Sequence, residues 1–110
     1  ELIEFGAHTL DHSILARLPA AQKRTQILAS IDAVTELTGQ ACRFFAYPNG
    51  GAADYDSDCL AALRDSGIAA ALTMVPGANT AATPRFEIHR HGIGAADSLA
   101  RFKLQCHNLL

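Results

Sequence analysis

The sequence predicts an α/β fold in which parallel strands alternate with helices. Short apolar runs alternate along the chain with longer segments whose apolar residues recur every three or four positions. Such alternation is typical of β-α-β units, which form a parallel sheet through right-handed crossovers. The chain has 110 residues, whereas a complete eight-stranded barrel needs about 250. We therefore expect one region, residues 1–110, that forms an open sheet or a partial barrel.

The first predicted elements are a short strand and the longest helix. Leu2–Phe5 is a mostly apolar run that leads into a glycine. Ala20–Thr38 follows as a helix, with Pro19 before it and Gly39 after it. A proline at the start and a glycine at the end are typical of helices. The spacing of the apolar residues places one stripe on this helix: Ile27, Leu28, Ile31, Val34 and Leu37.

Three further strands are expected in the rest of the chain. Phe44–Tyr47 is a compact apolar run that the segment Pro48–Gly51 stops, which favours a buried strand ending in a turn. Ile68–Met74 is short and apolar, and its length favours a strand over a helix. Phe86–His91 is a weaker strand candidate.

Two shorter helices complete the predicted fold. Ser57–Asp65 is a helix whose first turn Asp56 or Ser57 would cap. A closing helix begins after Asp97 or Ser98, because one of these can cap it. Its expected buried side consists of Leu99, Phe102, Cys106 and Leu109.

Composition and charge exclude several classes of protein. The net charge is −2, from 9 Lys+Arg and 11 Asp+Glu, so the chain lacks the basic surface of a nucleic-acid binder or a polybasic membrane peptide. No apolar run is long enough to span a membrane. The three cysteines have no C-x-x-C spacing, and we expect free thiols rather than a disulfide scaffold.

The residues after the first predicted strand suggest a metal site. In parallel α/β folds, functional groups gather at the carboxyl ends of the strands. His8 and His12 follow Leu2–Phe5 and would share one face if this stretch were helical. Imidazole nitrogens are common zinc ligands, and Asp11 would make a hydrogen bond that supports one of them. The alternative is a hydrogen-bonded histidine pair in a loop.

Two other strand ends carry candidate groups. The turn around Asn49 can present backbone N–H groups to a developing oxyanion, or it can be an ordinary turn. In the last strand, His89 and His91 would point one way and Arg90 the other. The alternative for this strand is an exposed edge. The sequence has no G-x-S-x-G, P-loop or G-x-G-x-x-G motif, which disfavours serine esterases, P-loop enzymes and dinucleotide sites.

Two segments resemble motifs of the NodB-homology polysaccharide deacetylases. G-A-H-T-L-D-H-S, residues 6–13, resembles the family's H-[ST]-x-x-H motif. F-A-Y-P-N-G, residues 45–50, resembles its third motif in the branch that carries F-A-Y-P-x-G. The order and separation of the two segments also fit. The resemblance covers the chain from Gly6 to about Leu104.

The resemblance implies a distorted (β/α) barrel of about seven strands that removes acetyl groups from N-acetylated polysaccharides. A divalent metal, most often zinc, would bind His8 and His12. The backbone N–H of Asn49 would stabilise the oxyanion. Tyr47, Pro48 and Arg90 would line the substrate site, and His91 or His89 would supply the acid.

The sequence also departs from the family pattern. The Asp-Asp motif that supplies the catalytic base and third metal ligand has no counterpart in the seven residues before His8. Ala46 occupies the place of the usual third-motif arginine, and Arg43 lies three residues too early. We therefore expect the carboxyl-terminal portion of a deacetylase domain, inactive by itself.

Two alternatives remain besides a deacetylase fragment. One is a catalytically silent module on the same scaffold that binds carbohydrate or another partner. The other is an unrelated α/β protein whose histidine pair is accidental. A partial barrel would also expose a sheet edge, so we expect a homodimer through the first strand.

Overall fold

The computed structural model describes residues 2–109. Its α-helices are α1 (Ala20–Thr38), α2 (Ser57–Ser66) and α3 (Leu99–Cys106), and a single 3-10 turn, η1, spans Leu15–Arg17. The strands are β1 (Phe44–Ala46) and β2 (Ala70–Leu72). α1 has the predicted bounds, and α2 ends one residue later than expected. No helix in this part of the chain is long and apolar enough to cross a membrane.

The helix ends follow from the residues found there. The carboxylate of Asp56 accepts a hydrogen bond from the Cys59 N–H and caps α2, and Ser98 caps α3 in the same way through Arg101. Gly39 and Gly67 end α1 and α2 with φ of 69° and 75°. These are left-handed conformations that glycine adopts without strain.

The sheet is parallel, as predicted. β1 pairs with β2 in the register Phe45 to Ala71. Single parallel bridges extend this pair on both sides, from Ala7 to β1 and from Ile88 to β2. The order across the sheet is therefore the order along the chain, which is the arrangement that successive β-α-β units produce.

The predicted strands are shorter than expected, and one is absent. Leu2–Phe5 forms no strand; its side chains are exposed, and the pairing lies later, at Ala7. Phe44–Tyr47 ends one residue earlier, at Ala46, Ile68–Met74 is reduced to Ala70–Leu72, and Phe86–His91 pairs only at Ile88. Apolar patterning favours extended backbone, but a strand also needs a hydrogen-bonded neighbour along its whole length.

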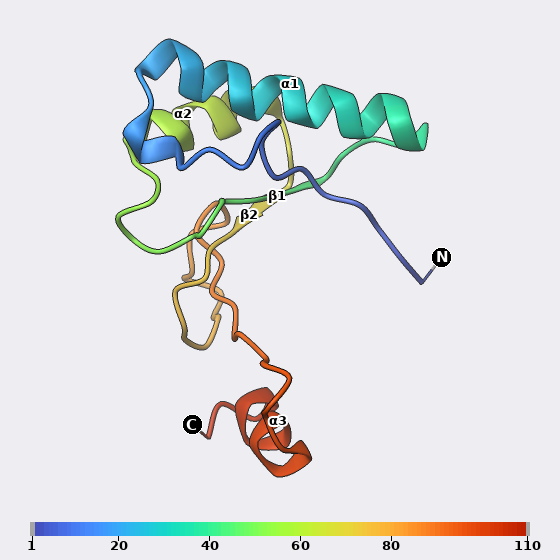
Figure 1. The fold of residues 1–110 in the computed structure, drawn as a ribbon, viewed down its shortest axis with the longest axis vertical. Helices are drawn as coiled ribbons and strands as arrows, with labels where there is room; N and C mark the ends of the chain where they lie inside the picture. Colours follow the sequence, from blue (N-terminus) through green and yellow to red (C-terminus); the bar gives the residue numbers. More distant parts are fainter. Residues whose placement is uncertain (1, 110) are drawn as a thin grey trace.

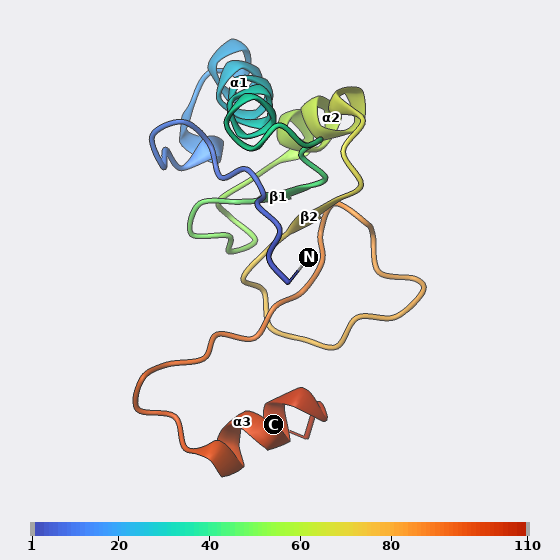
Figure 2. The same ribbon diagram turned by 90° about the vertical axis from the view of Figure 1, so that its right-hand side faces the viewer.

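α1 and α2 lie side by side over one face of the sheet (Figures 1 and 2). The core between them contains the fully buried side chains of Leu15, Ile27, Phe45 and Leu63. Lys23 of α1 is also buried, and its ammonium group lies 2.6 Å from the Asp56 carboxylate at the start of α2. This ion pair ties the two helices together.

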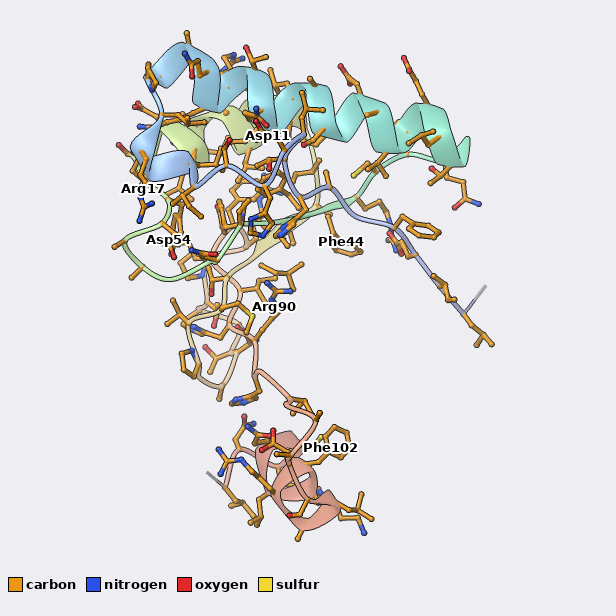
Figure 3. The ribbon with its side chains drawn as sticks, viewed as in Figure 1. Asp11, Arg17, Phe44, Asp54, Arg90 and Phe102 are labelled. Carbon is orange, nitrogen blue, oxygen red and sulfur yellow. The ribbon has the colours of Figure 1, made fainter. Side chains whose placement is uncertain are left out.

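α3 stands apart from this core (Figure 1). Figure 3 shows Phe102 on α3, away from the other labelled side chains. The expectation of a buried side on this helix is wrong, because Leu99, Phe102, Cys106 and Leu109 are all exposed. Cys42 and Cys59 are buried free thiols, as expected, whereas the free thiol of Cys106 is exposed.

Candidate functional site

The register of the sheet brings the candidate residues to one edge. Because the strands are parallel, their carboxyl ends lie at the same edge of the sheet. His8 directly follows the bridged residue Ala7, and Asn49 lies three residues beyond β1. Arg90 lies two residues beyond the bridged Ile88. This edge is where chemistry is expected in such folds.

His8 and His12 are brought together, but not by a helix. Their ring centroids are 4.8 Å apart with an interplanar angle of 68°. Residues 8–14 are irregular, and Thr9 and His12 have φ of 65° and 63°. The two histidines therefore do not share a helix face, because residues 8–14 form no helix. A tight loop with two left-handed residues pairs the rings instead.

The hydrogen bond of His8 leaves its other ring nitrogen free. Its Nδ1 lies 2.7 Å from the carbonyl oxygen of Ala46, at the end of β1. A carbonyl only accepts hydrogen bonds, so Nδ1 carries a proton, and in the neutral ring Nε2 keeps its lone pair. Carbonyl oxygens orient metal-binding histidines in this way. His8 also lines an open hollow of about 380 Å³ beside Ala46 and Leu72.

Several polar side chains hold the loop that carries this pair. Thr9 Oγ1 accepts a hydrogen bond from the His12 N–H, and Gln26 of α1 accepts one from the Leu10 N–H. Asp11 accepts hydrogen bonds from the hydroxyl and N–H of Ser13, which lower the pKa of its carboxyl. Asp11 is thus engaged by Ser13 and by Gln26. The roles of Thr9 and Gln26 were not predicted from the sequence.

The residues present fit part of a zinc shell. Imidazole nitrogens are common zinc ligands, and both rings are exposed. The hydrogen bond from His8 to a backbone carbonyl is also typical of histidines that bind zinc. Within residues 2–109, however, no group of three His, Cys, Asp or Glu side chains is arranged to hold a metal ion. The pair therefore offers two ligands, and no neighbouring carboxylate completes the set. Arg43, which lies three residues before the place of the third-motif arginine, forms an ion pair with Glu4.

The turn after β1 presents a backbone amide. Asn49 is exposed and has φ of 58°, and its N–H donates no hydrogen bond to any acceptor in residues 2–109. Gly50 follows with φ of 82°, and its carbonyl accepts a hydrogen bond from Met74. A Cβ at Gly50 would lie 2.8 Å from the Met74 nitrogen, so the close approach of the two strand ends requires glycine. Within these residues the Asn49 N–H is thus free to donate a hydrogen bond, which is what the predicted oxyanion role requires.

Tyr47 and Pro48 lie in the core. Both side chains are fully buried. The Tyr47 hydroxyl donates a 2.7 Å hydrogen bond to the Phe86 carbonyl, and its ring stacks on Tyr55 with centroids 4.3 Å apart. Burial raises the pKa of Tyr47 above its usual value. These two residues shape the turn from within, and their contact with substrate stays a prediction.

The last strand end places its three candidates in different contacts. Arg90 Nε donates a 2.7 Å hydrogen bond to the Thr73 carbonyl, which fixes the guanidinium at the end of β2 (Figure 3). His89 Nδ1 bonds the Val75 carbonyl, and His91 Nε2 lies 3.2 Å from the Asn108 side chain. Each histidine therefore keeps one ring nitrogen free, and neither is bonded to the His8–His12 pair.

Comparison with known proteins identifies the family. The family model described as polysaccharide deacetylase matches residues 1–71. The chain belongs to the polysaccharide deacetylase family. The match includes His8, His12 and the Asn49 turn, so the interpretation of an unrelated fold with an accidental histidine pair is wrong. No curated protein matches the chain significantly.

Solved deacetylase structures share this fold. The Streptococcus pyogenes deacetylase PplD, solved in complex with acetate, is 22% identical and superposes with a TM-score of 0.83 over 93% of this chain and 44% of its own. The BpsB deacetylase domain from Bordetella bronchiseptica is 25% identical, with a TM-score of 0.58 over 66% of this chain and 26% of its own. The chain thus spans less than half the length of either structure.

Proposed function

We propose that this chain contributes the histidine pair and the oxyanion turn of a metal-dependent hydrolase that removes N-acetyl or O-acetyl groups from a polysaccharide. The observation that carries the proposal is the His8–His12 pair, whose 4.8 Å ring separation and hydrogen bond from His8 to a carbonyl suit a divalent metal such as zinc. Family membership supports an acetylated carbohydrate substrate. We also propose that the strands and helices of this chain form part of a (β/α) barrel of the seven-strand type.

The chain's own residues would divide the work. His8 and His12 would hold the metal, which when bound supplies a Lewis acid and activates water. The free N–H of Asn49 would donate a hydrogen bond to the oxyanion. Arg90 would contact the sugar at the end of β2, and the free ring nitrogen of His91 or His89 would supply the acid. The remaining metal ligand and the base are not among the described side chains around the pair.

Zinc binding measured by calorimetry on the apo chain tests this proposal. We expect weak one-to-one binding, because two neutral imidazoles lack a carboxylate partner. His8→Ala and His12→Ala should each abolish it, whereas His107→Ala, at the residue that follows α3, serves as the matched control and should bind as the wild type does. If His12→Ala and His107→Ala bind zinc equally, the pair is not the site. Tight binding that His12→Ala abolishes would instead show that a local carboxylate completes the shell.

Because the described residues supply only two metal ligands at this site, we consider one second candidate function. A module that binds acetylated carbohydrate without cleaving it needs no third ligand or base. Titration with N-acetylglucosamine oligomers, followed by amide chemical shifts and by acetate release, separates the two. Shifts around Asn49 and Arg90 without acetate, in the presence of zinc, would favour the binding module.

We also propose that the chain associates with a second copy through its first segment. Leu2, Ile3 and Phe5 are exposed, and the sheet edge beside Ala7 has no further strand within the described residues. Open edges and apolar side chains favour such pairing.

A further inference from the structure

The loop that carries the histidine pair is held in an unfavourable backbone conformation. Thr9 and His12 both have φ near 65°, a region that residues with a Cβ seldom occupy. Two such residues within four positions persist only where the surrounding structure fixes them. The separation of the His8 and His12 rings depends on this conformation, because the loop is not helical.

Gln26 ties the tip of this loop to a rigid element. The Leu10 N–H donates a 2.8 Å hydrogen bond to Oε1 of Gln26, sixteen residues away on α1, and the Gln26 side chain also hydrogen-bonds the Asp11 carboxyl. The contacts from Thr9 to His12 and from Asp11 to Ser13 are local and move with the loop. Gln26 itself is half-buried, and its neighbour Ile27 is fully buried in the core, which anchors this turn of α1.

We propose that Gln26 is a positioning residue that sets the gap between the His8 and His12 rings for a divalent cation. The inference rests on the proposed function, because it assigns the pair to a metal. Among the described residues Gln26 hydrogen-bonds neither ring, and it acts through the Leu10 backbone and the Asp11 carboxyl. A loop fixed in advance loses less freedom when the cation binds, so its affinity is higher.

Zinc affinity and Leu10 amide exchange, measured on the same variants, test this role. Gln26→Met keeps the length and helix propensity of the side chain but removes the acceptor. Gln22→Met is the matched control, since Gln22 lies one turn earlier on α1, is exposed, and its side chain makes no hydrogen bond within residues 2–109. The double variant Gln26→Glu with Asp11→Asn exchanges donor and acceptor between these two positions. It keeps the acceptor for Leu10, the contact with position 11 and the net charge, and serves as the rescue.

We expect Gln26→Met to weaken zinc binding roughly tenfold, as is usual for groups that orient metal ligands, and to speed exchange of the Leu10 amide. Gln22→Met should match the wild type in both measurements, and the double variant should restore both. Equal zinc affinity in Gln26→Met and wild type overturns the inference, as does a double variant that binds as weakly as Gln26→Met. A wild-type chain that binds no zinc overturns the proposed function itself, and the inference with it.

Discussion

The Tyr47 hydroxyl donates its hydrogen bond to the Phe86 carbonyl, 39 residues along the chain. The bond is buried and joins the turn after β1 to the segment that pairs with β2 at Ile88. The Tyr47 ring is stacked on Tyr55, whose hydroxyl bonds Glu87 of the same segment. The turn that presents Asn49 is therefore held by two tyrosines that reach one segment.

Removing the Tyr47 hydroxyl should destabilise the fold. Tyr47→Phe leaves the buried Phe86 carbonyl without a partner, which costs about 1–3 kcal/mol. Urea unfolding should show this loss as a lower midpoint. Tyr55→Phe is the control, since its bond to Glu87 is only partly buried, and it should cost clearly less. Equal losses for the two variants would contradict the structural assignment.

Both tyrosines should titrate late in the folded chain. Burial and the Glu87 hydrogen bond raise the pKa of Tyr55 to about 12, and burial raises the pKa of Tyr47 further. In the unfolded chain both should ionise near pH 10. The unfolded state therefore releases these protons first, and folding free energy is lost as pH rises from about 10 toward 12. Tyrosinate absorbance that grows near pH 10 without unfolding would refute this.

The Asp56 cap should matter more than its neighbour Asp58. Asp56 both caps α2 and lies 2.6 Å from Lys23, whereas the Asp58 carboxylate is more exposed and lies 3.4 Å from it. Asp56→Ala should cost about 0.5–2 kcal/mol in urea unfolding. Asp58→Ala should cost less, because it removes the longer and more solvent-exposed contact. The prediction fails if the two variants are equally stable.

The same carboxyl gives the chain an acid dependence. Burial raises the pKa of Asp56, but hydrogen bonds from Lys23 and Cys59 lower it more, and the net direction is downward. A carboxyl with a lowered folded pKa stabilises the fold above its unfolded pKa of about 3.9, and this is lost as pH falls through the folded value. Wild-type stability should fall more steeply below pH 4 than that of Asp56→Ala.

Self-association should depend on the first segment. Phe5→Lys places a charge on the exposed face beside the open sheet edge, which opposes pairing with a second copy. Sedimentation should show a dimer for the wild type and a monomer for Phe5→Lys. Phe102→Lys, an equally drastic change at an exposed position on α3, should leave the dimer intact. A wild-type monomer at high concentration would end this proposal.

The helices show which features can be predicted from residues close together in the sequence. Ala20–Thr38 was predictable because its apolar spacing, its proline and its glycine act within a few residues of one another. The cap of α2 was narrowed to Asp56 or Ser57 in the same way, and the structure shows that it is Asp56. The closing helix shows the limit: Leu99 and Phe102 have the spacing of a buried side, yet they remain exposed, because burial requires a partner surface.

The sequence by itself determined the parallel α/β class, the helices and the turn with Asn49 after β1, because these depend on short-range spacing and on the order of elements. Only the tertiary structure decided that a strained loop pairs the histidines, that Gln26 reaches Leu10, and that Tyr47 turns into the core. Each of these rests on a contact between residues sixteen or more positions apart or on a backbone conformation that local propensity disfavours. Such features exist only because the packed chain holds them in place.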